Sequence, residues 1–238
     1  RLSTLREIHR AATAGRLSPD CATASFVPGS LREGRVDIKL SLGASRLGWH
    51  GQNTPSNTPW RQMTELEVRA RRQVQELADF MRQELPAFHK ARLGRMFTQV
   101  GPRTGRRAQG RATLSETDVL DCRKSEDGVA WGTWPVEVWE QEASPRLTRL
   151  PEGEYYEIPL GCLQAADCEC VWMAGRCLSA APHALASARV IGTAMSTGWA
   201  AGAAAAHQAS GRPLADAIVF LRGRSRETES QAGMEQTD

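Results

Sequence analysis

The segment from Val171 to Gly211 carries the residue types best suited to chemistry. It reads VWMAGRCLSAAPHALASARVIGTAMSTGWAAGAAAAHQASG, in which a short apolar run ends in Gly175 and Arg176, and a loop with His183 precedes Arg189. Arginine is a permanently charged, forked donor that suits phosphate or carboxylate. Histidine exchanges protons near neutral pH. The order therefore indicates a corner suited to an anion, followed by a histidine whose role the order alone does not decide.

The same segment predicts the elements that position these residues. Residues 170–175, CVWMAG, are typical of a strand buried in a parallel sheet, and ligands of open α/β folds bind at the carboxyl ends of such strands. A helix is expected to begin near Ser187 as its N-cap, so that its free N–H groups and Arg189 favour an anion. Small residues on one face predict close packing on a sheet or a flat ligand: Gly192, Met195, Gly198 or Trp199, Gly202 and Ala205.

Purely structural roles are also open for these residues. A strand, a loop and a helix of small residues commonly form an ordinary sheet–helix contact. A single histidine such as His183 is more often a hydrogen-bonded structural residue than a catalyst, and Arg176 alone fits a surface ion pair.

Several elements are expected upstream. Residues 1–16 predict a short helix, and residues 35–42 alternate like a half-buried strand. Thr64 and Glu67 have the spacing of a capping box, which predicts a helix that Pro86 stops. The charged face of this helix is expected to be solvated.

The middle and the end of the chain show weaker patterns. Residues 95–100 predict a strand, and Ser115 with Asp118 predicts a capped helix start. Residues 129–139, with three tryptophans, are expected on extended chain. The charged residues 222–238 are expected to be a disordered tail.

Composition narrows the partners. The 238 residues carry a formal net charge of +3, so no nucleic-acid partner is expected. The least favoured hypothesis is a nucleic-acid-binding module built on the arginine-rich turn 103–111. An affinity for DNA or RNA that falls steeply with salt concentration would be its signature. No apolar run reaches about 18 residues, so no membrane partner is expected. Without a targeting pattern, we expect a cytoplasmic protein.

Six cysteines are present, and four of them lie close together with the spacing C-x5-C-x-C-x6-C. No C-x-x-C pair occurs, so a metal site is not predicted. The cysteines are expected to be small buried residues in a reducing compartment.

A family resemblance covers about residues 60–211. The segments IPLGCL and VWMAGRCLSAAPHALASARVIGTAMSTGWAAGAAAA closely resemble the C-terminal part of the FAD-dependent oxidoreductases related to the glutathione-reductase-type and fumarate-reductase-type flavoproteins. TELEVRARRQVQELADFMRQELPAF resembles the helix before that family's core arginine motif. VGPRTGRRAQGRATLSETDVL is similar to its G-x-R-x-x-R-R-x-x-G turn and the start that follows.

The resemblance implies an α/β fold, here the C-terminal part of a two-domain FAD-binding flavoprotein. Residues 1–150 would be a portion of the substrate or cap domain. Residues 151–221 would be the strand–loop–helix segment of an FAD/NAD(P)-binding domain that is incomplete in this chain.

It also implies roles for individual residues. Gly175 and Arg176 would border the flavin of FAD, and the N-terminus of the last helix would face its isoalloxazine ring through Arg189, Val190 and Ile191. Two further roles concern a small-molecule substrate: Arg103, paired in the motif with Arg106, would bind it, and His183 would transfer a proton.

The chain departs from the family pattern at several positions. Thr104 and Gly105 stand where the family has Glu and Thr, Ala112 replaces an aromatic residue, and Trp199 replaces a smaller polar one. These departures bear on the substrate contacts more than on the flavin contacts.

A larger departure is the lack of a G-x-G-x-x-G sequence after a strand, which in the family binds the pyrophosphate. The chain also opens on Arg1 instead of Met. We therefore expect a C-terminal portion whose partner is the missing N-terminal FAD-binding portion.

Two functions follow. The first is an FAD-dependent oxidoreductase that moves a hydride or an electron pair between a small organic substrate and flavin N5. The alternative is a non-catalytic remnant, or a subunit, that does not bind FAD on its own.

Overall fold

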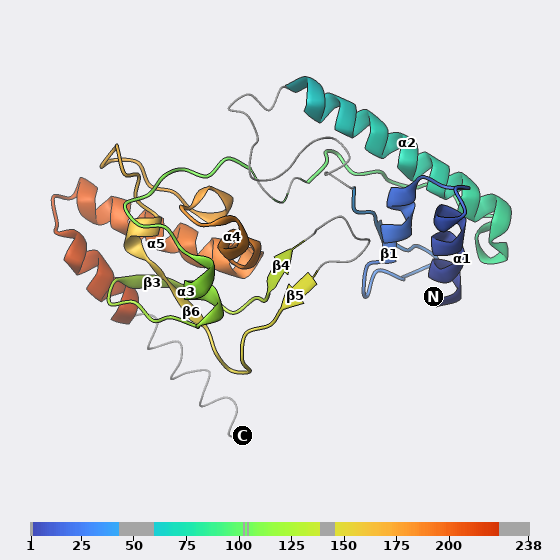
Figure 1. Ribbon diagram of the computed structural model, residues 1–238. Coiled ribbons are helices and arrows are strands. Elements are labelled where there is room, and N and C mark those ends of the chain that lie inside the picture. The colour runs from blue at the N-terminus through green and yellow to red at the C-terminus, as the bar shows by residue number, and fades with distance from the viewer. Residues whose placement is uncertain (1, 43–59, 102, 104, 139–145, 224–238) are drawn as a thin grey trace. The chain divides into compact units, whose positions relative to one another are not determined.

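The computed structural model describes residues 2–42, 60–101, 103, 105–138 and 146–223 (Figure 1). The chain divides into two compact units. The first holds residues 1–102 and 139–145, and the second holds residues 103–138 and 146–238. This division rests on packing alone, so the functional division expected at residue 150 stays a prediction.

The first unit combines two helices with a two-stranded ribbon. The helices α1 (Leu2–Thr13) and α2 (Trp60–Glu84) confirm the two predicted from the sequence. The ribbon is the antiparallel pair β1 (Ser25–Phe26) and β2 (Ile38–Lys39), which is shorter than the strand expected over residues 35–42. Apolar residues of both helices and of the connection after α1 form the core: Ile8, Ala11, Ala12, Leu17, Cys21, Leu77, Phe80, Met81 and Leu85.

Two expectations for this unit are wrong. Because α2 already begins at Trp60, Thr64 lies inside the helix and does not cap it. Residues 95–100 form no strand. Their backbone bonds to side chains of α2 instead: the Thr98 carbonyl accepts from Arg71, and the Val100 N–H donates to the Glu67 carboxylate.

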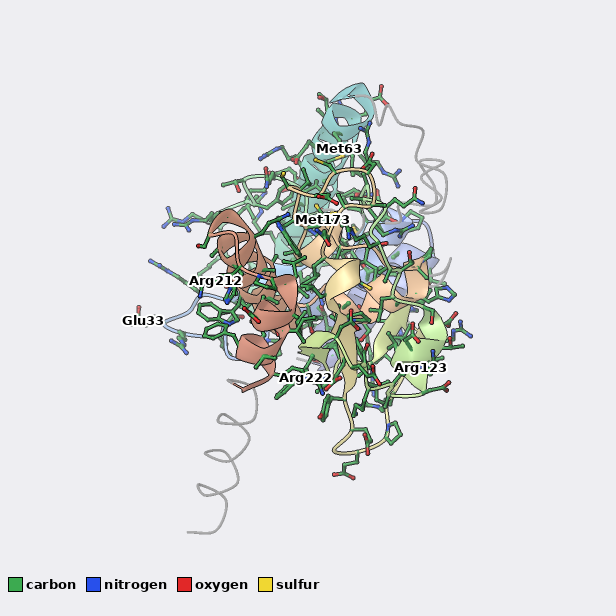
Figure 2. The ribbon with its side chains drawn as sticks, turned by 90° about the vertical axis from the view of Figure 1, so that its left-hand side faces the viewer. Glu33, Met63, Arg123, Met173, Arg212 and Arg222 are labelled. Atoms are coloured by element: carbon green, nitrogen blue, oxygen red, sulfur yellow. The ribbon has the colours of Figure 1, made fainter. Side chains whose placement is uncertain are left out.

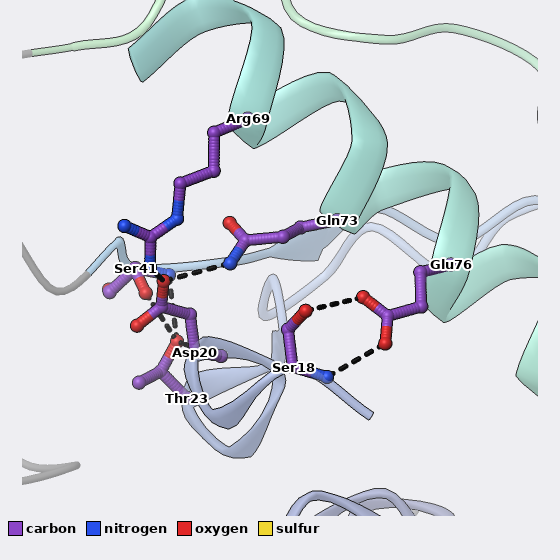
Figure 3. A network of polar contacts seen from close by, with 7 residues as sticks. All are labelled: Ser18, Asp20, Thr23, Ser41, Arg69, Gln73 and Glu76. Carbon is purple, nitrogen blue, oxygen red and sulfur yellow. Dashed lines mark hydrogen bonds and ion pairs between the residues drawn. The ribbon is translucent and has the colours of Figure 1, made fainter. Parts of the chain in front are cut away.

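Polar contacts join α2 to the 3-10 helix η1 (Pro19–Thr23), as Figure 3 shows. Asp20 is 4% exposed and accepts from Arg69 Nη2 at 2.8 Å and from Gln73 Nε2 at 2.9 Å. Glu76 accepts from the backbone N–H and the hydroxyl of Ser18, at 2.8 and 2.6 Å. Part of the charged face of α2 is therefore packed and not solvated, contrary to the expectation.

Replacing Asp20 tests this network. Asp20→Ala removes the carboxylate that accepts from the Arg69 guanidinium and from the buried side-chain amide of Gln73. We therefore expect it to lower the free energy of unfolding by about 2–4 kcal/mol. The exposed Asp37 provides the matched change, Asp37→Ala, expected to cost less than about 0.5 kcal/mol. Urea unfolding followed by circular dichroism measures both, and equal midpoints for the two variants would contradict the assignment.

The second unit contains two antiparallel ribbons. β3 (Gly128–Gly132) pairs with β6 (Tyr156–Pro159), and β4 (Val136–Val138) pairs with β5 (Arg146–Thr148). The extended chain predicted over residues 129–139 is thus confirmed for its described part, with Pro135 between two strands. The core of the unit draws on both ribbons and the helices, and its largest side chains are Leu114, Val119, Tyr156, Ile158, Leu163, Leu178 and Leu185.

The helices α3, α4 and α5 belong to this unit as well. α3 (Glu116–Leu120) begins with the predicted capping box: Ser115 Oγ accepts from the Asp118 N–H at 3.1 Å, and the Asp118 carboxylate accepts from the Ser115 N–H at 2.8 Å. α4 (Pro182–Ala188) packs against β4, and α5 (Ile191–Ala209) packs against β3 (Figure 1).

The helix start expected near Ser187 is wrong. Ser187 lies inside α4 and is fully buried, and the chain leaves helical geometry only at Val190, which has an extended backbone. The Ser187 hydroxyl is used elsewhere, because it bonds Tyr156 Oη at 2.8 Å and the carbonyl of Trp134. It therefore ties α4 to β6 and to the segment before β4.

The buried parallel strand expected over residues 170–175 is also wrong. These residues make one antiparallel bridge, Trp172 with Gln164, and Val171 is 47% exposed. The segment is one arm of a hairpin, in which the Met173 N–H donates to the Leu163 carbonyl at 2.7 Å.

α5 buries a different face from the one expected. Met195 and Trp199 are 71% and 58% exposed, and apart from the adjoining residues and the backbone of α5, no described heavy atom lies within 4 Å of where a Cβ of Gly198 or Gly202 would stand. The buried side chains point the other way: Thr193, Thr197, Ala200, Ala201, Ala204 and His207. The small alanines let α5 approach β3 closely.

The chain is helical again over residues 214–223, so the disordered tail expected from residue 222 begins too early. Arg222 lies at the end of this helix (Figure 2) and donates from Nη1 to the carbonyls of Ser125 and Glu126, at 2.6 and 2.9 Å. The rest of the expected tail, residues 224–238, lies outside the described residues.

Tyr156 gives a spectroscopic test of this core. Its ring occupies the space that a Cβ at Gly132 would need, 2.2 Å away, and burial raises the pKa of its hydroxyl to about 12 although the bond to Ser187 lowers it. The unfolded chain loses this proton near pH 10, whereas the folded chain keeps it until the pH reaches about 12. The ionisation of Tyr156 therefore leaves the free energy of unfolding at its full value below pH 10 and lowers it as the pH rises toward 12.

The chain has two tyrosines, so their ionisation can be followed by absorbance at about 295 nm. We expect Tyr156→Phe to remove the step near pH 12 and Tyr155→Phe to retain it. A late step that survives in Tyr156→Phe would contradict the burial of this hydroxyl.

Candidate functional site

Two of the residues singled out from the sequence meet at one glutamate. Arg103 Nη1 donates to Glu137 Oε1 at 2.6 Å, and Arg189 Nη2 lies 3.4 Å from the Glu137 backbone carbonyl. Glu137 is the middle residue of β4, and Arg189 is the C-cap of α4, which packs on that strand. The fold therefore gathers two guanidinium groups at one glutamate, one at its carboxylate and the other at its backbone carbonyl.

One donor of the Arg189 guanidinium lacks a described hydrogen-bond partner. Its Nε is buried and has no hydrogen-bond partner among the described residues. Desolvation lowers the pKa of this guanidinium, the charge of Arg103 lowers it further, and Glu137 opposes both effects. A second acceptor or negative charge at this place would satisfy the group.

The N-terminus of α5 follows directly. Its N-cap is Val190, whose side chain cannot accept a hydrogen bond, and Ile191 is 80% exposed. The first N–H groups of this 19-residue helix thus have no side-chain cap, and they carry the partial positive charge of the helix. Arg189 and the N-terminus of α5 are thus adjacent in the chain, and each carries positive charge and a donor without a described side-chain partner.

The Gly175–Arg176 corner is held against the same helix, α5, by a hydrogen bond. It forms the 3-10 helix η5 (Gly175–Cys177), in which Gly175 has φ +58°, a conformation that other residues rarely adopt. The Gly175 N–H donates to Thr197 Oγ1 at 3.1 Å, which fixes the corner on the second turn of α5. The Arg176 side chain is exposed.

His183 stands apart from the arginine pair. It lies in the first turn of α4, six residues before Arg189, which corresponds to about 9 Å along the helix axis. Its Nδ1 is 2.9 Å from Glu116 Oε2 on α3. No described contact joins His183 to Arg103 or Arg189, so the structure does not bring the two predicted catalytic residues together.

Sequence reasoning missed two residues of the site. Glu137 alternates with the apolar Val136 and Val138, which marks it as facing the other side of its strand but does not identify its partners. Thr197 looks like one more small residue in an alanine-rich helix, and only the fold reveals its bond to Gly175.

The cysteines are only partly buried. Cys21 and Cys162 are 0% exposed, and burial is the first cause that raises the pKa of each thiol to about 12. Cys168, Cys170 and Cys177 are exposed, so the expectation of buried cysteines is wrong for them. Within the described residues, no three His, Cys, Asp or Glu side chains are grouped to hold a metal ion.

None of the helices within the described ranges has the length and apolar character that a membrane span requires.

Glu137 can be tested apart from any ligand. Glu137→Gln removes the ion-pair partner of Arg103 and a negative charge close to Arg189, so we expect the free energy of unfolding to fall by about 1–2 kcal/mol at low salt. The exposed Glu154→Gln is the matched control, and Glu137→Gln combined with Arg103→Gln should recover part of the loss. Urea midpoints that do not separate Glu137→Gln from Glu154→Gln would contradict a stabilising ion pair between Arg103 and Glu137.

The chain was compared with known proteins. The family model described as FAD dependent oxidoreductase matches residues 12–220. Comparison with the curated proteins gave no match. The search of the solved structures gave none either. The family match covers most of the described residues, including the arginine pair, the Gly175 corner and α5, and on that ground the chain belongs to the FAD dependent oxidoreductase family.

Proposed function

We propose that this chain supplies the flavin-facing part of an FAD-dependent oxidoreductase. The observation that carries the proposal is the set of unsatisfied donors where α4 passes into α5: the buried Arg189 Nε has no described hydrogen-bond partner, and the N–H groups at the start of α5 have no side-chain cap. FAD, when bound, supplies hydride or electron-pair transfer at flavin N5.

The residues of this site fit a flat ligand with negative charge at one edge. Arg189 and the first N–H groups of α5, at Val190 and Ile191, would stabilise that charge. Gly175 lets the backbone turn tightly at the neighbouring corner, and Arg176 adds a charged side chain at its rim. The exposed glycine face of α5 leaves room for a planar ring.

The substrate would be a small organic molecule with a polar or carboxylate group. Arg103 is the residue proposed to bind it, exchanging its partner Glu137 for the substrate or sharing the two. His183 is proposed to move a proton: Glu116 engages its Nδ1, which leaves Nε2 for the exchange. Because His183 lies about 9 Å along α4 from Arg189, it would act at the far end of the substrate.

The pyrophosphate of FAD needs a further partner. The sequence contains no G-x-G-x-x-G element, and α5 presents an exposed apolar face that includes Met195 and Trp199. We propose that a dinucleotide-binding portion outside these residues packs on that face and holds the pyrophosphate. The alternative of a remnant that does not bind FAD rests on the same missing element.

Titrating FAD into the isolated chain, with flavin fluorescence as the readout, tests the site. We expect measurable binding, weakened at least about tenfold by Arg189→Met because a charge-assisted donor is lost. Arg212→Met, a change of an exposed arginine of the same unit (Figure 2), should leave the affinity unchanged.

Equal affinity of Arg189→Met and the unchanged chain would contradict the location of the site. No binding by the unchanged chain at millimolar FAD would favour the remnant or incomplete subunit instead.

A further inference from the structure

The exposed cysteines Cys168 and Cys170 lie in a four-residue turn that the flavin site does not use. The Val171 N–H donates to the Cys168 carbonyl at 3.2 Å, which closes the turn, and Glu169 and Cys170 occupy its two middle positions. Both thiols are exposed and free. Exposed thiols add nothing to packing, so their place here calls for a chemical explanation.

The turn is held from several sides. The Glu169 carbonyl accepts from the side-chain amides of Gln164, at 3.2 Å, and Gln208, at 3.0 Å. The Glu169 carboxylate forms an ion pair with Arg111 at 3.0 Å. At the base of the hairpin, the Ala165 N–H donates to the Val171 carbonyl at 3.0 Å. The backbone between the two cysteines is thus fixed by contacts on both flanks.

The backbone of this turn suits a disulfide. Two residues that are two positions apart in a closed turn have Cα atoms about 5–6 Å apart, inside the range of about 4.4–6.8 Å that disulfides span. A metal site with three or more His, Cys, Asp or Glu ligands has no support within the described residues, which leaves a reaction between the two sulfurs themselves.

We propose that Cys168 and Cys170 form a reversible redox-active dithiol that low-molecular-weight disulfides oxidise. The thiolate of one cysteine attacks the small disulfide, forms a mixed disulfide and releases one small thiol. The second thiolate then attacks the cysteine sulfur of that mixed disulfide and releases the second small thiol. The protein gives up two electrons and two protons, and the small disulfide receives both as it becomes two thiols.

The other cysteines are less suited to this reaction. Cys21 and Cys162 are fully buried, and their raised pKa values keep them as thiols. Cys177 is exposed but lies on η5, outside the turn. A bond in a tight, exposed turn is strained and easily reduced, so we expect it to open again under mild reducing conditions.

Oxidised glutathione is the probe that tests the proposal on the reduced full chain. Intact mass and peptide mapping should show loss of two hydrogen atoms within the peptide that contains Cys168 and Cys170. Cys168→Ser and Cys170→Ser should instead retain a glutathione adduct on the remaining cysteine, at least about tenfold more than the unchanged chain does. Cys177→Ser is the matched control and should oxidise like the unchanged chain.

A second probe, the trivalent arsenical phenylarsine oxide, tests the proximity of the sulfurs without oxidation. One equivalent should bind the unchanged chain and Cys177→Ser and resist a monothiol, but not bind Cys168→Ser or Cys170→Ser. Persistent glutathione adducts on both cysteines of the unchanged chain would overturn the proposal, and so would a disulfide that includes Cys177. Neither experiment requires FAD, so its outcome is independent of the proposed function.

Discussion

Glu137 is the constraint on which the candidate site depends. Its carboxylate binds Arg103, the first residue of the second unit, and its backbone carbonyl lies beside Arg189 at the end of α4. Without it, two guanidinium groups would repel each other in a partly desolvated place. One acidic residue on a three-residue strand thereby decides where the positive charge of the site lies, and it leaves one buried donor of Arg189 for another acceptor.

α5 divides its two faces between the fold and an open surface. Its alanines and two threonines pack against the unit, and Thr197 also holds the Gly175 corner. The opposite face, with Met195 and Trp199, is exposed. A helix that is apolar on both faces is typically buried on both faces. The unit described here covers one of these faces.

Local signals in the sequence held at some positions and failed at others. The Ser115–Asp118 box starts α3, and Pro86 ends α2 close to where its missing N–H requires. The same spacing at Thr64 and Glu67 did not mark a start, because α2 already begins at Trp60. The buried face of α5 could not be predicted, because small residues surround the whole helix and the pattern lacks contrast. The break at Val190 has no Gly or Pro signal. The partners of Glu137 depend on residues 34 and 52 positions away, which no local pattern encodes.

The length of α4 has a consequence for how the chain can change. Each helical residue advances the backbone by about 100° and 1.5 Å. Ser187 must reach Tyr156 on the core side while Arg189, two positions later, reaches β4. An insertion or deletion between them would swing one of the two contacts out of reach. We therefore expect natural variants of this segment to keep its spacing, whereas the exposed turn at Gly153 can lengthen freely.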